Sequence, residues 1–369
     1  MTTDADTRFM TMALALARRG LGVVWPNPAV GCVLVKDGAV VGRGWTQPGG
    51  RPHAETEALR RAGDAARGAV AYVTLEPCSH HGKTPPCADA LIAAGIARAV
   101  IAIEDPDPRV NGRGIKALQD AGIDVTSGVC SAEAEELNSG FLSRTTRGRP
   151  HVTLKLAASL DGKIATHNGE SHWITGPAAR REAHRLRSTH DAIMVGSGTA
   201  LNDNPMLDCR LPGLGDRSPV RIVADRRLRL PLTSSLVATA RERPTWLVTL
   251  PDADRKRRAA FEECGVEVLM VAPAKPGMED MHHVLSDLAG RGITRLLVEG
   301  GASLAAALLQ ADLVDRLAWF RGPLMIGGDG LAAVSAFGID HLVQGPRFLR
   351  MHQRAVGNDL YETFVRVRD

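Results

Sequence analysis

Long apolar runs are missing from this sequence, and so are the usual marks of export. No segment approaches the ~20 consecutive apolar residues that cross a bilayer. The first residues lack the basic segment and apolar core of a signal peptide. Six cysteines in 369 residues are too few for a disulfide framework. We therefore expect a cytoplasmic protein that has no membrane partner.

An excess of one charge is also missing. The formal net charge is only +4, and the arginines are scattered instead of forming a Lys/Arg block. The sequence therefore gives no case for a nucleic-acid partner. Phosphorylated small molecules need only one or two cations at one place, so the composition leaves them open as ligands.

The first part of the chain alternates between helical and strand periodicity, which predicts a three-layer α/β domain. A turn at Asp37-Gly38 joins the first two expected strands as a hairpin. Helices are expected at 8–19, 53–61, 88–94 and 115–121, and strands at 30–35, 40–45, 69–75, 97–103 and 124–128.

The polar segment 145–150 breaks this periodicity, and we interpret it as a linker. It divides the chain into domains at 1–147 and 148–369. A second α/β series follows, with helices between its strands and one clear helix at 302–309. Strands are expected at 151–157, 192–195, 220–224, 244–250, 266–271, 295–298, 313–320 and 360–366.

Three residues of the first domain have the chemistry of a metal site. His53 begins the unit 53–55 (HAE), and Cys78 and Cys87 close the two ends of the loop 78–87 (CSHHGKTPPC). One imidazole and two thiolates give zinc three protein ligands and leave a fourth position for water, as in catalytic zinc sites. Zinc lowers the pKa of that water to about 7, and Glu55 is placed to move its protons. This set is typical of zinc-dependent base deaminases.

The cysteine loop could instead form a structural zinc site, with His80 or His81 as the fourth ligand. A structural site has no use for Glu55, and His53 and Glu55 stand together at a predicted helix start. We therefore favour the catalytic interpretation. His80 and His81 are then expected to be solvated or to face the substrate.

Asn27 lies between two prolines in the segment 26–31 (PNPAVG), just before the first expected strand. A rigidly held amide can contact a bound nucleoside, and a plain turn residue is the alternative. Beside the zinc set, we expect a substrate contact.

These segments carry a resemblance. The segments 26–31 (PNPAVG), 53–55 (HAE) and 77–78 (PC) resemble the cytidine and deoxycytidylate deaminase superfamily. Most members of that superfamily bring their two cysteines close, as Cys-x-x-Cys, whereas eight residues intervene here. The longer loop, followed by 104–114 (EDPDPRVNGRG), is similar to the riboflavin-biosynthesis deaminase. The similarity covers about residues 7–147.

The second half is similar to the riboflavin-pathway reductase, which has a dihydrofolate-reductase-like fold. The matching segments are 154–163 (LKLAASLDGK), 171–176 (SHWITG), 195–199 (VGSGT), 203–205 (DNP) and 298–304 (VEGGASL). Together, the resemblances place nearly the whole chain in the bifunctional deaminase-reductase family of riboflavin biosynthesis. They imply an α/β fold with an N-terminal three-layer cytidine-deaminase-like domain and a C-terminal dihydrofolate-reductase-like domain. The implied cofactors are one Zn²⁺ per chain and NADPH.

The resemblance also implies roles for single residues of the second domain. Lys155 and Glu299 are candidates for polarising the reacting sugar. The residues at positions that contact NADPH in the family are Ala157, Trp173, Thr199, Asp203, Gly300 and Gly301. Those at positions that contact the substrate are Ser171, Arg187, Leu207, Arg210 and Glu299.

Physical reasoning on these residues is consistent but weaker. Gly300 and Gly301 let the backbone approach a phosphate before a helix start, although a tight strand-to-helix turn is the alternative. The loop 196–199 has the same two interpretations, and neither loop is a Rossmann fingerprint. Arg187 and Arg210 suit bidentate phosphate binding, and the alternative is that they are ordinary surface arginines.

We therefore expect an enzyme with two activities on small phosphorylated pyrimidines. The first domain removes a ring amine of a diaminopyrimidinone ribosylamine 5′-phosphate, and the second reduces the ribosyl group to ribityl with NADPH. A homo-oligomer is expected, because small α/β reductases of this kind often pair through a sheet. One alternative is a zinc deaminase of cytidine or tRNA whose C-terminal domain has an unrelated function. The other is a zinc-stabilised metabolite-binding regulator, which the presence of Glu55 argues against.

Overall fold

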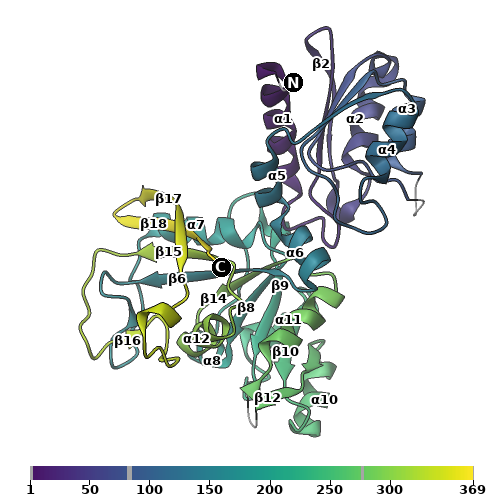
Figure 1. Cartoon of the computed structure of the whole chain (residues 1–369). Coiled ribbons are helices and arrows are strands. Elements are labelled where there is room, and N and C mark those ends of the chain that lie inside the picture. Colours follow the sequence, from purple (N-terminus) through teal and green to yellow (C-terminus); the bar gives the residue numbers. More distant parts are fainter. Residues whose placement is uncertain (1–2, 81–84, 276–277, 369) are drawn as a thin grey trace. The chain divides into compact units, whose positions relative to one another are not determined.

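The computed structural model describes residues 3–80, 85–275 and 278–368. The chain divides into two compact units, Met1–Gly148 and Arg149–Asp369, called here the N-terminal and the C-terminal unit (Figure 1). Among the described residues, no helix combines the length and the apolar character needed to span a membrane.

The N-terminal unit is built on a five-stranded sheet of order β2-β1-β3-β4-β5. Its first strand is antiparallel to β2 and β3, and β3, β4 and β5 are parallel. The strands are β1 (Gly31–Lys36), β2 (Ala39–Trp45), β3 (Val70–Val73), β4 (Arg98–Ile101) and β5 (Asp124–Ser127). The helices are α1 (Asp4–Ala17), α2 (Ala54–Ala62), α3 (Cys87–Ala93), α4 (Arg113–Asp120), α5 (Ser131–Leu137) and α6 (Ser139–Arg147).

Helices cover both faces of this sheet. In Figure 1, α2, α3 and α4 lie on one face, and α1 and α5 lie on the other. Cys32, Val33 and Leu34 of β1 are accordingly inaccessible to solvent. The sequence of a strand that is buried on both faces is typically a continuous apolar run. The predicted three-layer α/β domain is confirmed.

Glycines in the sheet bring two helices unusually close to it. A Cβ atom on Gly44 of β2 would lie 2.2 Å from the carbonyl oxygen of Ala54, and one on Gly31 of β1 would lie 1.9 Å from that of Ala13. No side chain fits at such distances. The first turn of α2, which carries Glu55, therefore rests directly on β2.

The C-terminal unit contains a nine-stranded sheet of order β11-β10-β9-β8-β14-β6-β15-β18-β17. The strands from β11 to β15 in this order are parallel, and β18 and β17 are antiparallel to their neighbours. Its strands are β6 (His151–Ala158), β8 (Ala192–Gly196), β9 (Val220–Ala224), β10 (Thr245–Thr249), β11 (Glu267–Met270), β14 (Arg295–Glu299), β15 (Arg316–Arg321), β17 (Phe348–Val356) and β18 (Asp359–Arg366).

The parallel strands place several loops at one edge of this sheet, because their carboxyl ends meet there. Two small sheets accompany it, β7 (Lys163–Ala165) with β16 (Leu331–Ala332) and β12 (Pro273–Lys275) with β13 (Met278–Glu279). The helices of the unit are α7 (Pro177–Arg187), α8 (Ser197–Asp203), α9 (Ser235–Ala238), α10 (Arg255–Glu263), α11 (Met281–Gly290) and α12 (Ala302–Gln310).

The predicted linker is partly wrong. Helix α6 continues to Arg147, so the first residues of the segment 145–150 are helical. The linker was predicted from the polarity of these residues. The Thr146 hydroxyl, however, donates to the Leu142 carbonyl at 2.8 Å inside the helix. The helix ends at Gly148, whose φ of 66° lies in the left-handed region that glycine accepts readily. The irregular connection is therefore only 148–150.

Two other differences have clear physical causes. The first helix begins at Asp4 instead of residue 8, because Thr3 and Asp6 form a reciprocal capping box. Strand β17 was not predicted, since nearly all of its residues are exposed at the sheet edge and show no apolar alternation.

Candidate active sites

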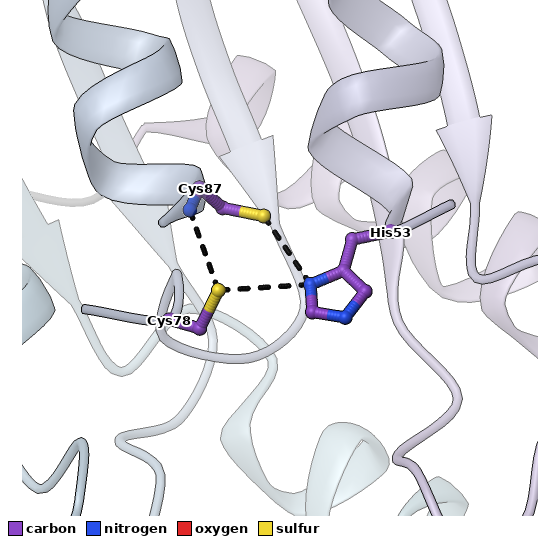
Figure 2. A group of neighbouring side chains, drawn as sticks. All are labelled: His53, Cys78 and Cys87. Carbon is purple, nitrogen blue, oxygen red and sulfur yellow. Dashed lines mark hydrogen bonds between the residues drawn. The ribbon is translucent and has the colours of Figure 1, made fainter. Parts of the chain in front are cut away.

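The three predicted metal ligands of the N-terminal unit lie together. His53 is the N-cap residue of α2, Cys87 is the first residue of α3, and Cys78 lies on the segment that follows β3. The His53 Nδ1 atom is 3.6 Å from Cys78 Sγ and 3.3 Å from Cys87 Sγ (Figure 2). All three ligand atoms lie within 4.8 Å of one another.

These separations fit a tetrahedral zinc ion. Zn–N bonds of about 2.0–2.1 Å and Zn–S bonds of about 2.3 Å place the nitrogen and sulfur ligands of one ion about 3.6 Å apart. The Cys87 N–H donates to Cys78 Sγ at 3.3 Å, so the thiolate is stabilised before any ion arrives. Hydrogen bonding with Cys87 also lowers the pKa of Cys78 to about 4. The donor set therefore suits a zinc ion with an open fourth position.

Glu55 faces this cluster from the first turn of α2. Its side chain is 3% exposed, and it interacts with Cys87. Burial, followed by the charge of Cys78, raises the pKa of Glu55 to about 7. A carboxyl group with a pKa near neutrality can both accept and donate a proton.

The predicted substrate side of the cluster is only partly defined. Asn27 packs against Gly50 on the loop before His53, since a Cβ on Gly50 would lie 1.8 Å from the Asn27 amide nitrogen. Ser79 Oγ and His80 Nδ1 are buried and have no hydrogen-bond partner within the described ranges 3–80, 85–275 and 278–368. His81 lies outside the described residues.

In the C-terminal unit, the sheet register brings two predicted residues together. Lys155 of β6 and Glu299 of β14 are direct partners on neighbouring strands, with Lys155 Nζ 3.7 Å from Glu299 Oε2. Arg187, at the end of α7, donates to both carboxylate oxygens of Glu299, at 2.7 and 2.9 Å. The result is a largely buried group of two cations around one carboxylate.

Charge decides the protonation state of Glu299. Burial would raise its pKa, but Arg187 and then Lys155 outweigh that effect and bring the pKa of Glu299 to about 2. The remaining nitrogen of Arg187 donates to the Asp208 carbonyl at 3.0 Å. Three of the five N–H groups of Arg187 thus donate to protein atoms, and its predicted contact with the substrate stays a prediction.

The other three predicted substrate residues of the C-terminal unit lie outside this charged group. The Arg210 side chain is 66% exposed, with its Nε 3.5 Å from Asp208 Oδ1. Leu207 packs into the core, with only 3% of the residue exposed and a backbone φ of 52°. Ser171 lies on the segment before α7, where its Oγ is 3.4 Å from His172 Nδ1.

Two loops at the carboxyl edge form the predicted cofactor region. Gly300 and Gly301, with φ of 95° and 91°, connect β14 to α12. A Cβ on Gly300 would lie 3.5 Å from Thr199 Oγ1, and one on Gly301 would lie 3.6 Å from the Gly196 nitrogen. The two loops are therefore neighbours, and the N-terminus of α12 opens beside them, as a phosphate-binding site requires.

The remaining predicted cofactor residues are spread around this edge. Ala157 lies near the end of β6, and Asp203 lies exposed at the end of α8. Trp173 is 66% exposed, with the Arg180 guanidinium 4.3 Å from its ring centroid. An exposed, cation-backed indole is a suitable stacking surface for a ring of a ligand.

Sequence reasoning missed residues that organise this region. The Asp208 carbonyl accepts a hydrogen bond from Arg187, and the Arg210 backbone N–H donates to His184 Nδ1 at 3.2 Å. Arg229 donates to Ser197 Oγ at 2.5 Å beside the predicted cofactor loop. The sequence offered no signal for these contacts, because they join positions far apart in the chain.

A known family matches each of the two units. The family described as "Cytidine and deoxycytidylate deaminase zinc-binding region" matches residues 3–103, and the "RibD C-terminal domain" family matches residues 150–361. The first match contains His53, Glu55 and Cys78, and the second contains Lys155, Arg187 and Glu299.

Similar proteins extend over nearly the whole chain. The riboflavin biosynthesis protein RibD of Escherichia coli (strain K12) is 45% identical over 366 residues, which cover 96% of this chain and 98% of that protein. RibD of Bacillus amyloliquefaciens is 42% identical, with 97% and 95% covered.

Solved structures are also similar over nearly the whole chain. Form 1 of Acinetobacter baumannii RibD superposes with a TM-score of 0.88 at 38% identity, covering 99% of each chain. A diaminohydroxyphosphoribosylaminopyrimidine deaminase/5-amino-6-(5-phosphoribosylamino)uracil reductase from Thermotoga maritima gives a TM-score of 0.87 at 34% identity, covering 98% of this chain and 99% of that one. The expected fold, a cytidine-deaminase-like unit followed by a dihydrofolate-reductase-like unit, is confirmed. The chain belongs to the RibD family of riboflavin-biosynthesis enzymes.

Proposed function

We propose that this chain catalyses two successive reactions of riboflavin biosynthesis on one phosphorylated pyrimidine. Residues 1–147 would remove a ring amine from a diaminopyrimidinone ribosylamine 5′-phosphate, and residues 148–369 would reduce the ribosyl group to ribityl. The observation that carries the proposal is the His53, Cys78 and Cys87 cluster with Glu55 against it, in a chain that matches RibD along its length.

The deaminase half would bind one zinc ion through His53, Cys78 and Cys87. Zinc supplies a water molecule acidic enough to serve as a nucleophile at neutral pH. Glu55 accepts the proton of the nucleophile, protonates a ring nitrogen and passes a proton to the departing ammonia. Asn27 would orient the pyrimidine with its amide, and the buried His80 Nδ1 supports a further contact with the substrate.

The reductase half would take its hydride from NADPH, which supplies the chemistry while the protein positions and polarises. Lys155, with Glu299 beside it, is the cation that stabilises negative charge on the sugar oxygen as hydride arrives. Arg187 holds Glu299 ionised and in place. The exposed Arg210 would be a cation that pairs with the substrate phosphate.

The other site assignments follow the family pattern. NADPH would contact Gly300, Gly301 and Thr199 at the neighbouring loops, with Ala157, Trp173 and Asp203 around them. The substrate would contact Ser171 and the backbone of Leu207 in addition to the charged group. Only small phosphorylated pyrimidines are proposed as partners, besides a second copy of the chain in a homo-oligomer, and the cytoplasm is the proposed location.

Ammonia release and NADPH absorbance test the two halves separately. The zinc-loaded protein should release ammonia from the pyrimidine ribosylamine phosphate, and NADPH should then be oxidised. Cytidine and tRNA are the comparison substrates, and preferential release of ammonia from either one would favour the alternative function. Supplying the deaminated intermediate directly isolates the reductase, and an unchanged NADPH absorbance would remove that half of the proposal.

A further inference from the structure

One buried carboxylate of the N-terminal unit has no part in the reactions above. Glu76 lies between β3 and Cys78 and is 3% exposed. Its own N–H donates to the Ile103 carbonyl at 3.0 Å, which fixes its backbone to the chain after β4. Its side chain faces the segment 105–115, which contains most of the motif 104–114 to which the proposed reactions assign no role.

Four backbone N–H groups of this segment donate to the Glu76 carboxylate. Oε2 accepts from Asp105 at 3.2 Å and from Gly112 at 3.0 Å. Oε1 accepts from Gly114 at 2.8 Å and from Ile115 at 3.1 Å. The last two N–H groups belong to the first turn of α4, where they have no partner inside the helix. Both ends of the segment are thus held by charge-assisted hydrogen bonds to one side chain.

The same segment borders the metal-ligand loop. A Cβ on Gly114 would lie only 2.0 Å from the Pro77 carbonyl oxygen, so α4 starts directly against the residue before Cys78. Helix α4 also contacts α3, which begins with the ligand Cys87. Between the two anchored ends, Asp107 lies within the electrostatic influence of His80. The segment is therefore a neighbour of the proposed pyrimidine site on more than one side.

We propose that Glu76 is a positioning residue of the deaminase, holding the segment 105–115 as a fixed wall of the site that binds the phosphorylated pyrimidine. The inference rests on the proposed deaminase function. Glutamine cannot replace Glu76 here, because it offers one acceptor oxygen and directs an NH₂ group at two of the four N–H donors. The wall would then loosen without any change in the zinc ligands.

The test uses the full-length, zinc-loaded variant Glu76→Gln. We expect faster amide hydrogen exchange in peptides covering 104–116, and a KM for the pyrimidine phosphate raised by about 10- to 100-fold with a smaller change in kcat. Zinc content and NADPH oxidation with supplied intermediate should equal those of the wild type. Glu104→Gln, which changes an exposed carboxylate directly before the segment, should match the wild type in every measurement.

Gly114→Ala provides a second variant, because its methyl group pushes the segment off Pro77 without altering a carboxylate, and the same pattern is expected. Unchanged exchange at 104–116 would overturn the inference, as would faster exchange with unchanged deaminase kinetics. Loss of zinc together with both activities would also overturn it, since Glu76 would then support the fold as a whole. A wild-type enzyme that releases no ammonia would instead refute the proposed function, and the inference with it.

Discussion

Glu55 is the residue on which the proposed deaminase chemistry depends most directly. Exchanging it for glutamine keeps the size of the side chain but removes the group that moves protons, so Glu55→Gln should lower ammonia release by about 10²- to 10⁴-fold. Its zinc content, measured by elemental analysis, should stay at one ion per chain. Glu57→Gln is the matched control, because Glu57 lies two residues further along the same helix and pairs with Arg60 at 3.0 Å. A zinc-loaded Glu55→Gln enzyme with near-normal turnover would contradict the role.

Glu299 makes stability depend on pH in a defined direction. Its pKa of about 2 in the folded chain lies below the ordinary value of 4.5, so its ionised form favours folding. This contribution, about 3 kcal/mol, is complete above pH 4.5 and is lost as pH falls toward 2. Between pH 5 and about 2.5, the urea midpoint of wild type should therefore fall more steeply than that of Glu299→Gln. Parallel curves for the two proteins would show that the ion pair contributes nothing.

At the scale of elements, the contact between α2 and β2 controls the metal site. Gly44→Ala places a methyl group where the Ala54 carbonyl now lies, 2.2 Å from the added atom. Helix α2 must then move away and take His53 and Glu55 with it. We expect weaker zinc retention against a chelator and a deaminase rate reduced by at least about tenfold. The NADPH oxidation rate serves as the internal control, and an equal loss of both activities would point to general unfolding instead.

The sequence predicted most elements because their signals are local. The apolar runs of β1 and β8 and the unit 53–55 before α2 define structure within a few residues. The metal cluster was also predictable, because its ligand types and spacing are diagnostic. Strand β17 was not, since an exposed edge strand carries no apolar pattern. The polar end of α6 was missed because polarity suggested a linker, whereas the Thr146 hydroxyl finds its partner inside the helix.

The contacts that could not be predicted in the two sites join residues that are far apart in the chain. Glu76 and its four donors are 29 to 39 positions apart in the chain, and Arg187 and Glu299 are 112 positions apart. No local pattern indicates such partners. The pairing of Arg187 with the Glu299 carboxylate could therefore not be predicted, whereas its predicted contact with the substrate phosphate stays a prediction.

At the scale of the whole molecule, the two units have separate hydrophobic cores and separate candidate sites. Removing zinc should therefore stop one reaction only. After treatment with a chelator, the protein should release no ammonia, yet it should oxidise NADPH at the normal rate when the deaminated intermediate is supplied. Adding zinc back should restore ammonia release. Simultaneous loss of both reactions would mean that the metal supports the reductase unit as well.

The pairing of Lys155 with Glu299 has a consequence for how this enzyme can change. Their separation is set by the hydrogen-bonded register of two central strands, and no loop takes part in it. The segments that differ most freely among relatives are loops at the sheet edge. Exchanging those loops between homologues, or redesigning them for another sugar or cofactor, should therefore leave the reacting pair in place. Ligand selectivity in this unit could then change while the separation of Lys155 and Glu299 is kept.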